Sequence, residues 1–421
     1  MLAGGTSCAV SSDDLAPGDL TAKSSLTCNA NAWVFMGNDA NACNGKIGES
    51  CGWTTSNLGQ GYHCAATSWG TDCTPGGATC PGGSGGGGTG TAPASLLFSA
   101  YKDTGVHMNW NTNVISTTLS GAATEIASDL VANSGKLITL AFATGECGSE
   151  DWAGVPGAAM ASANKSRLTS AGVKYIVATG GAAGSFTCGS DTGFATFINR
   201  WASPNLIGVD FDIEAGQSQA VINNLIHRIG VAHTAHPELR FSLTLATIAN
   251  NNGASTARSL GAGVADSLDV LGDEALAAVR STLGFNGSPA SWPSYVTVNL
   301  MVMDYGTASR DVCVVSGGSC EMGQSAIQAA FNLRDRFGVP LSNIELTPMI
   351  GGNDVGNEHF TLANVDTMTS FAIANGLAGV HYWSYDRDTD CPQGPASDTC
   401  NSLGGVGAHG FLRRFLADGL H

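Results

Sequence analysis

The sequence predicts an α/β protein in which a (β/α)8 barrel, that is a TIM barrel, occupies residues 95–421. The first observation is that apolar, strand-like runs alternate with helix-like stretches through this part of the chain. The second is that acidic residues end the fourth run, and active sites of such barrels lie where strands end. The third is a change of composition near residue 95, which marks a small disulfide-rich N-terminal module and a Gly-rich linker before the barrel.

Residues 1–74 are interpreted as a small cysteine-rich accessory module. Seven of the 13 cysteines lie in or just beyond it: Cys8, Cys28, Cys43, Cys51, Cys64, Cys73 and Cys80. This density is typical of a small domain held by disulfides, and the Cys-x2-Cys spacing of the alternative, a zinc site, is absent. The odd number leaves one cysteine unpaired or bonded to one outside the module. Trp33, Trp53, Tyr62 and Trp69 fit either a small core or stacking on sugar rings, so carbohydrate binding is one of two interpretations of this module.

A linker follows the module. Residues 75–94 read PGGATCPGGSGGGGTGTAPA, a Gly-rich sequence without an apolar period. Such a sequence behaves as a flexible tether. We therefore predict that the barrel begins at residue 95.

Charge and composition limit the partners of the protein. The formal net charge is -16 with only 18 Lys and Arg residues, so no basic patch is expected for nucleic acid or an anionic membrane. No run approaches the roughly 18 apolar residues of a membrane span, and the first residues lack the pattern of a signal peptide. The cysteines favour an oxidising compartment. We expect a secreted monomer, whose signal peptide is absent from this sequence, that acts on neutral substrates.

The barrel strands are predicted from apolar runs of five to ten residues. The eight runs are residues 96–101, 137–144, 175–179, 206–214, 241–247, 296–305, 344–350 and 379–385. Between them, an apolar helical stripe runs through residues 219–235, and a second ends before the stop signal of Gly338 and Pro340.

The fourth run carries three acids at every second position, Asp210, Asp212 and Glu214. Side chains alternate between the two faces of a strand, so these carboxylates would share one face. Crowded carboxylates shift each other's pKa values apart, as acid and base roles require. Two alternatives stay open, namely an edge strand that exposes the acids to water and a divalent cation bound by them. The continuously apolar residues 206–209 favour a buried strand, and no further cluster of acids or His supports a metal, so we predict none.

Ordered segments of the barrel resemble motifs of glycoside hydrolase family 18, the chitinases and their relatives. Residues 207–214 resemble the D-x-x-D-x-D-x-E signature, with an isoleucine in place of the first acid. Residues 178–181 resemble the S-x-G-G segment of the third strand. Residues 301–306 are similar to the sixth-strand motif M-x-Y-D, in the M-x-M-D-Y form of some bacterial chitinases. Residues 347–354 and 379–384 resemble the seventh- and eighth-strand segments of the same branch.

The resemblance implies hydrolysis of β-1,4 bonds between N-acetylglucosamine units of chitin, with retention and through an oxazolinium intermediate formed by the substrate's own acetamido group. It implies Glu214 as general acid and base, and Asp212 as the partner of the acetamido group. It also implies that Asp210 shares a proton or hydrogen bond with Asp212. It implies no cofactor and no metal. The residues that it implies for substrate binding are Asp304, Tyr305, Met303, Trp383, Gly180 and Gly181.

Two of these residues have an alternative role, and one further residue departs from the family signature. Met303 stands where the simple sixth-strand motif has Tyr, so Tyr305 is a candidate for that hydrogen bond. Trp383 is expected to form an apolar floor under the sugar, with a barrel-core role as the alternative. Ile207 replaces the first acid of the signature; strand alternation places it on the face opposite to Asp210, so we expect activity to survive the replacement.

The expected partners are chitin or N-acetylglucosamine oligosaccharides, and endo and exo action are both compatible with the sequence. Two other functions stay open: an endo-β-N-acetylglucosaminidase that acts on N-glycans, and a non-catalytic chitin-binding lectin of the same fold. The three acids favour an enzyme, and the tethered aromatic module favours an insoluble polymer.

Disulfides are also predicted within the barrel. Two pairs are close enough in sequence for local bridges, and one pair follows neighbouring predicted strands, where it could join two loops. These pairs are Cys313 with Cys320, Cys391 with Cys400, and Cys147 with Cys188.

Overall fold

The computed structural model describes residues 96–214, 216–252, 267–394 and 396–420, and the backbone of five short strands before residue 96. The chain divides into two compact units, Met1–Pro93 and Ala94–His421. The strands of the first unit are β1 (Ser7–Ala9), β2 (Ser25–Thr27), β3 (Ser50–Cys51), β4 (Tyr62–Thr67) and β5 (Gly70–Pro75). The predicted cysteine pairing, aromatic residues and linker of this region lie outside the residues whose side chains are described.

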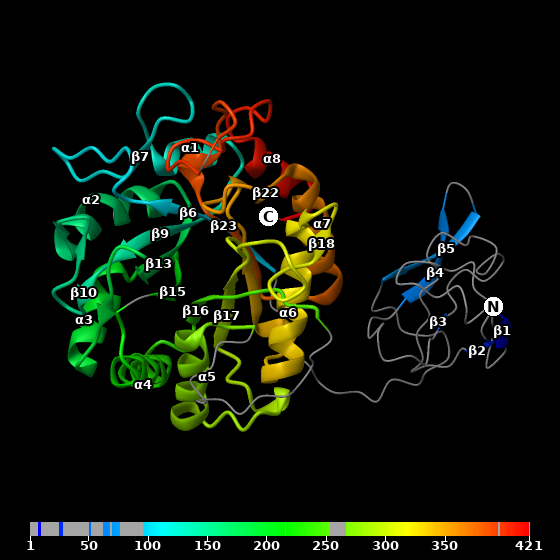
Figure 1. Cartoon of the computed structure of the whole chain (residues 1–421). Helices are drawn as coiled ribbons and strands as arrows, with labels where there is room; N and C mark the ends of the chain where they lie inside the picture. The colour runs from blue at the N-terminus through cyan, green and yellow to red at the C-terminus, as the bar shows by residue number, and fades with distance from the viewer. Residues whose placement is uncertain are drawn as a thin grey trace. The chain divides into compact units, whose positions relative to one another are not determined.

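The second unit is a closed barrel of parallel strands surrounded by helices, which confirms the predicted fold (Figure 1). Each of the eight predicted runs overlaps one barrel strand. The strands are β6 (Leu97–Asp103), β9 (Leu137–Ala143), β13 (Lys174–Gly180), β15 (Leu206–Ile213), β16 (Arg240–Ala246), β17 (Val296–Met301), β20 (Ile344–Thr347) and β23 (Gly379–Tyr382).

Helices connect these strands. They are α1 (Ile126–Ala132), α2 (Gly157–Ser170), α3 (Asp191–Trp201), α4 (Gln219–Ala235), α5 (Val270–Leu283), α6 (Met322–Phe337), α7 (Leu362–Asn375) and α8 (Gly410–Ala417). The predicted stop signal is confirmed, because α6 ends at Phe337 and Gly338 caps it with a φ of 78°. Among the described residues, none of the helices has the length and apolar character needed to cross a membrane.

The loops between these elements contain short strands and 3-10 helices. The strands are β7 (Ser116–Thr117), β8 (Thr124–Glu125), β10 (Gly145–Glu146), β11 (Asp151–Trp152), β12 (Val155–Pro156), β14 (Phe186–Thr187), β18 (Val315–Ser316), β19 (Ser319–Cys320), β21 (Gly351–Gly352) and β22 (His359–Phe360). The 3-10 helices are η3 (Pro289–Ser291), η4 (Leu341–Asn343) and η5 (Tyr385–Arg387).

Three barrel strands, β17, β20 and β23, end at least three residues before the apolar runs that predicted them. β17 ends at Met301, because the chain turns at Asp304 and Gly306, whose φ values are 50° and 96°. β20 ends at Thr347, because the next residue, Pro348, has no backbone N–H for a strand ladder. For β17 and β20, the apolar residues beyond the strand end belong to loops at the carboxyl end of the barrel.

β15 lies inside the sheet, between β13 and β16, so the edge-strand alternative for its acids is excluded. Phe211 faces the helices, where its ring lies 6.4 Å from that of Phe186 and 5.9 Å from that of Phe194. Asp210 and Asp212 have the opposite orientation and face the barrel interior, as strand alternation requires.

The barrel interior is unusually polar at the amino end of its strands. His381 lies 2.7 Å from the hydroxyl of Ser99 and 2.6 Å from Glu345, which also forms an ion pair with Arg240. Burial and the positive charge of Arg240 lower the pKa of His381 to about 3. His381 is therefore neutral at neutral pH.

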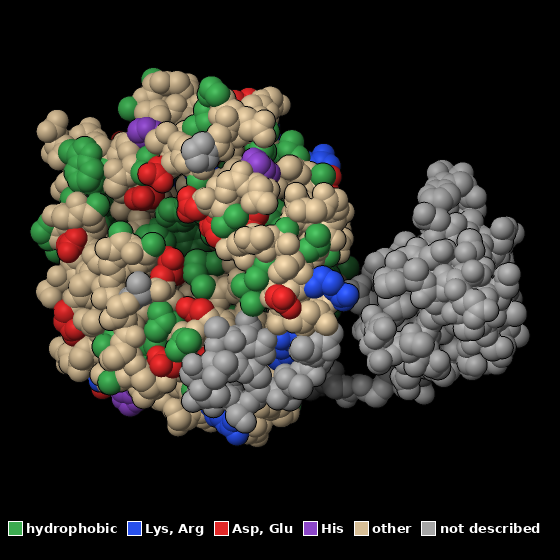
Figure 2. Space-filling view, in the orientation of Figure 1, with side chains coloured by type: hydrophobic (Ala, Val, Ile, Leu, Met, Phe, Trp, Pro, Cys, Tyr) green, Lys and Arg blue, Asp and Glu red, His purple; other side chains and the backbone are tan. Residues whose placement is uncertain are grey.

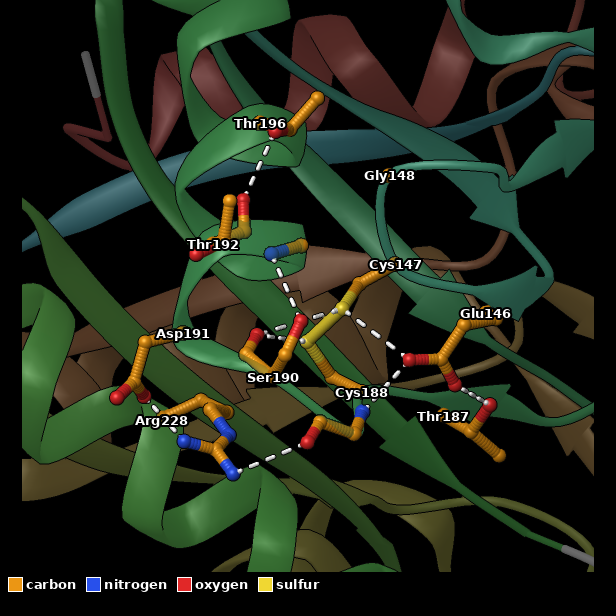
Figure 3. The surroundings of a disulfide bond; sticks show 12 residues. Glu146, Cys147, Gly148, Thr187, Cys188, Ser190, Asp191, Thr192, Thr196 and Arg228 are labelled. Carbon is orange, nitrogen blue, oxygen red and sulfur yellow. Dashed lines mark hydrogen bonds and ion pairs between the residues drawn. A yellow bond between two sulfur atoms is a disulfide. The ribbon is translucent and has the colours of Figure 1, made fainter.

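The three predicted disulfides of the barrel are confirmed: Cys147–Cys188, Cys313–Cys320 and Cys391–Cys400. The first joins the loops that follow β9 and β13 (Figure 3). Beside it, Glu146 accepts a hydrogen bond from the backbone amide of Gly189 at 2.6 Å. All six barrel cysteines are thus paired with each other, so within this chain none of them is a partner for the odd cysteine of the N-terminal module.

Candidate active site

A cavity of about 600 Å³ opens at the carboxyl ends of the barrel strands. Asp212 and Glu214 line it from the end of β15, and Trp383 lines it after β23. Figure 2 shows a hollow in this face, with apolar side chains inside it and carboxylates around it. A cavity of this size is typical of sites for small ligands.

Asp210 is buried, with 1% of its surface exposed, and hydroxyl groups hold both of its oxygens. Oδ1 accepts hydrogen bonds from Ser242 at 2.6 Å and Thr244 at 2.7 Å, and Oδ2 accepts one from Tyr101 at 2.9 Å. Burial raises the pKa of Asp210, and the three hydroxyl donors oppose this by favouring the carboxylate. These contacts fix the orientation of Asp210 behind Asp212.

Asp212 and Glu214 form a hydrogen-bonded carboxyl pair at the cavity wall. Burial raises the pKa of both, and the charges of Glu214 and Asp210 raise the pKa of Asp212 further. For Glu214, the bond to Asp212 and a backbone hydrogen bond from Ala182 partly offset the effect of burial. Two carboxyl groups that interact in this way titrate as a pair. The hydrogen bond of Asp212 is thus to Glu214, and a shared proton or hydrogen bond between Asp210 and Asp212 stays a prediction.

One oxygen of this pair has no partner among the described residues. Asp212 is 5% exposed, and its Oδ1 accepts no hydrogen bond. A buried polar atom without a partner costs free energy, and such atoms cluster where a ligand supplies the missing contact. The oxygen therefore marks the place in the cavity where a donor on a ligand would bind.

The hydroxyl network that holds Asp210 was missed by the sequence analysis. Asn299 donates from Nδ2 to Tyr101 and to Thr244, both at 2.9 Å, and its Oδ1 accepts from Thr347 at 2.7 Å. A signal was present, because these polar residues occupy alternate positions within apolar runs and so must face the acids across the barrel interior.

Gly180 and Gly181 lie on the strand and turn beside Asp212. A Cβ on Gly180 would lie 2.0 Å from the backbone oxygen of Asp212, and one on Gly181 would lie 2.8 Å from the ring of Phe142. Both have a positive φ, of 87° and 84°. Gly180 permits the close approach of β13 to β15, and Gly181 leaves room for the ring of Phe142 on β9. Neither glycine is among the residues that line the cavity. Their contact with a substrate stays a prediction.

Replacing Gly180 by Ala is expected to destabilise the barrel by about 2–5 kcal/mol, because the substitution adds a clash to a left-handed backbone. Gly154→Ala is the matched control, since Gly154 has a φ of 88° but no atom lies within 4 Å of the point that its Cβ would occupy. Urea unfolding of both variants measures the difference. Equal losses would show that the contact with Asp212 has no energetic role.

The loop after β17 brings two of the predicted residues to the cavity and buries the third. Met303 and Asp304 line the cavity. Tyr305 is 3% exposed and packs in the core, and its hydroxyl has no hydrogen-bond partner among the described residues. Burial, together with the charges of Glu358 and Glu321, raises its pKa. A contact of Tyr305 with a substrate stays a prediction.

Two side chains that the sequence analysis missed hold this loop. Glu358 accepts hydrogen bonds from the backbone amides of Tyr305 at 3.0 Å and Gly306 at 2.9 Å. Asn353 accepts one from the amide of Asp304 at 3.3 Å. Burial raises the pKa of Glu358 to about 7. These bonds keep Asp304 in its left-handed conformation, with a φ of 50°, and so fix its side chain at the cavity.

Trp383 is half-buried and lies against two aromatic rings. Its ring is stacked on Phe142, with centroids 5.6 Å apart and an angle of 20°, and lies 6.1 Å from the ring of Tyr101. It also lines the cavity, so it presents apolar surface there rather than filling the barrel core. This position fits the predicted floor beneath a sugar.

The structure also shows where Ile207 lies and which described side chains are spaced for a metal ion. Ile207 lies near the start of β15. It is four residues before Phe211, so strand alternation places its side chain on the same face as Phe211, opposite to the interior acids. Among the described residues, the group of side chains spaced for a metal is Glu146, Cys147 and Cys188. Because those two cysteines form a disulfide, they offer no thiolate to an ion.

No family model matches the sequence, and a search of curated proteins finds no match. Solved structures do match the fold. The catalytic domain of a hyperthermophilic chitinase from Pyrococcus furiosus is 21% identical, with a TM-score of 0.55 over 78% of this chain and 98% of that chain. Catalytic-site mutants of active domain 2 of a thermostable chitinase from Pyrococcus furiosus, complexed with chito-oligosaccharides, are 21% identical, with a TM-score of 0.54 over 80% and 99%. The barrel therefore has a family 18 chitinase-like fold.

Proposed function

We propose that the barrel is the catalytic domain of a chitinase, which hydrolyses β-1,4 bonds between N-acetylglucosamine units with retention. The observation that carries this proposal is the hydrogen-bonded carboxyl pair of Asp212 and Glu214, which lines the wall of a cavity at the carboxyl ends of the barrel strands. The fold supports it, because a structure of the same fold is a chitinase complexed with chito-oligosaccharides.

The first chemical step uses Glu214 as a general acid. Its carboxyl gives a proton to the glycosidic oxygen while the carbonyl oxygen of the substrate's acetamido group attacks the anomeric carbon. The bond to the leaving sugar breaks, and a positively charged oxazolinium forms. The raised pKa of Glu214 keeps its proton available at mildly acidic and near-neutral pH.

Asp212 supports the acetamido group during this step. Its unpartnered Oδ1 accepts the acetamido N–H, and its negative charge stabilises the oxazolinium as positive charge develops. Asp210, fixed by three hydroxyls, contributes a second negative charge behind it.

The second step reverses the proton transfer. Glu214, now a carboxylate, takes a proton from a water molecule as the water attacks the anomeric carbon from the side that the leaving sugar vacated. The ring of the oxazolinium opens, the acetamido group is restored, and the configuration is retained. Trp383 supplies the apolar surface beneath this sugar, and Asp304 helps to hold its acetamido group.

A comparison of substrates tests the proposal. We expect cleavage of soluble N-acetylglucosamine oligomers, and none of fully de-N-acetylated glucosamine oligomers, which lack the nucleophile. A high-mannose glycopeptide in the same assay tests the alternative endo-β-N-acetylglucosaminidase. Binding of the oligomers without any cleavage would instead support a lectin.

We propose that the N-terminal unit binds insoluble chitin and so keeps the barrel close to its substrate. We also propose that the protein acts outside the cell. Removal of residues 1–93 is expected to leave kcat/KM on soluble oligomers nearly unchanged and to lower the rate on insoluble chitin, because a tether raises the effective concentration of the enzyme at a surface. Rates on both substrates, measured before and after removal, give the result. Equal losses on both would contradict an accessory role. The extracellular location stays a prediction, with which the three disulfides are compatible.

A further inference from the structure

One buried carboxylate holds together two loops at the carboxyl end of the barrel. Glu358 lies between β21 and β22 and is 1% exposed. Its Oε2 accepts a hydrogen bond from the backbone amide of Tyr305 at 3.0 Å, and its Oε1 accepts one from the amide of Gly306 at 2.9 Å. Both amides belong to the loop after β17, which carries Asp304 to the cavity. Each oxygen of Glu358 is therefore used as an acceptor.

The same two loops are also bonded in the opposite direction. Oδ1 of Asp304 accepts a hydrogen bond from the amide of Val355 at 3.0 Å, and the amide of Asp304 donates to Oδ1 of Asn353 at 3.3 Å. The amide of Glu358 donates to the carbonyl of Val355 at 2.9 Å, and its carbonyl accepts from the amide of Asn353 at 3.0 Å. Asp304 and Glu358 thus share two partners, through which a change at Glu358 reaches the cavity.

The backbone of Asp304 depends on this support. Its φ of 50° lies in the left-handed region, which a residue with a side chain keeps only where its surroundings hold it. A carboxylate accepts at both oxygens, whereas a carboxylic acid carries a proton on one of them and donates from it. With Glu358 protonated, the amide of Tyr305 or of Gly306 would face an O–H group. A buried amide without an acceptor is costly, so the loop is expected to leave the arrangement that presents Asp304.

The surroundings of Glu358 place this change near neutral pH. Burial raises its pKa to about 7, the two amide hydrogen bonds oppose the rise, and the negative charge of Asp304 adds to it. Glu358 is therefore a carboxylate above about pH 7 and a carboxylic acid below it. Tyr305 stays neutral, because burial raises its pKa. The other charged or titratable groups of this region are Glu321 at the start of α6, Asp354 and His359 near Glu358 in the chain, and Arg387 on η5.

We propose that Glu358 is a positioning residue, and that only its ionised form holds Asp304 where it can bind the substrate's acetamido group. This inference rests on the proposed function, in which Asp304 contacts that group. Glu358 is not among the described residues that line the cavity, so it acts through the loop. Oligomers should bind about three- to tenfold more weakly when Glu358 is protonated, the range for the loss of one hydrogen bond.

The test measures the Kd of an N-acetylglucosamine tetramer at about pH 6 and about pH 8, where Glu358 is mostly protonated and mostly ionised. The full chain with Glu214→Gln is the starting protein, because it is expected to bind oligomers without hydrolysing them. Its Kd should be about three- to tenfold higher at the lower pH. An equal Kd at the two pH values would overturn the proposal without any substitution at Glu358.

The addition of Glu358→Gln then assigns the effect to this residue, since Gln resembles the protonated acid, with one acceptor oxygen and one donor group. At about pH 8 its Kd should rise to the value that the starting protein has at about pH 6, and the Kd ratio between the two pH values should fall by about three- to tenfold. A ratio that Glu358→Gln leaves unchanged would overturn the proposal. If this variant does not fold, the pH comparison in the starting protein decides.

Asp390→Asn is the matched control. Asp390 also accepts hydrogen bonds from two successive backbone amides, those of Val406 and Gly407, both at 2.9 Å, but it is not among the residues that line the cavity. Burial opposes its ionised form, but the hydrogen bonds that it accepts outweigh burial and lower its pKa, so it stays ionised at both pH values. The control should keep the Kd ratio of the starting protein. Failure of the unmodified protein to cleave oligomers would overturn the proposed function itself, an outcome distinct from an unchanged Kd ratio.

Discussion

Replacement of Glu214 by Gln is expected to lower the hydrolysis of N-acetylglucosamine oligomers by at least about 100- to 10,000-fold, the contribution typical of a general acid and base. Gln has nearly the shape of Glu and can still bond to Asp212, but it has no proton to give to the glycosidic oxygen. Oligomer binding should survive, since the cavity keeps Trp383 and Asp304.

The measurement is kcat by product release, together with a binding titration on the same variant. Glu238→Gln is the control, because Glu238 is exposed and its side chain does not line the cavity. A Glu214 variant within tenfold of the unmodified protein would place the general acid elsewhere.

Replacement of Asp212 by Asn is expected to lower kcat more than it weakens binding, because the contact with the acetamido group strengthens as positive charge develops. A thiazoline mimic of the cyclic intermediate should inhibit the unmodified protein strongly and this variant weakly. Asp335→Asn, on the exposed surface, is the control. Trapping of a covalent sugar ester on Asp212 or Glu214 would falsify the substrate-assisted step.

The same variant should unfold at a higher temperature than the unmodified protein at neutral pH. Burial raises the pKa of Asp212 in the folded state. The unfolded chain therefore loses this proton at a lower pH than the folded protein does, and the free energy of unfolding falls as pH rises. Asn carries no charge and avoids the penalty. The gain in midpoint should vanish below about pH 4, the ordinary pKa of an aspartate, where Asp212 is protonated in both states. A midpoint difference that does not depend on pH would contradict this account.

The barrel could be predicted because its signals are local. An apolar run predicts a strand whatever its neighbours are, and eight runs alternating with helical stretches predict the closed barrel. Alternation within residues 206–214 was enough to place Asp210 and Asp212 on one face. The cavity contact of Trp383 was likewise predictable from its position after the last strand.

What could not be predicted depends on contacts between distant segments. Glu358 holds the loop of Asp304 from a position 54 residues later in the chain, and nothing near it in the sequence indicates that role. Whether Tyr305 faces a substrate or the core depends on a single turn, because the positive φ of Asp304 redirects the chain there. The hydrogen bond between Asp212 and Glu214 depends on side-chain distances, which strand periodicity does not give.

The acids and the walls of the cavity are carried by different parts of the barrel. Asp210 and Asp212 belong to β15, which is bonded to a strand on each side, whereas Met303, Asp304 and Asp354 stand on loops beyond the strand ends. Loops accept insertions and exchanges that a central strand does not. An engineer could therefore graft the loops of a relative onto this barrel and change which polymers it degrades without rebuilding the carboxyl pair, and natural variation is open to the same route.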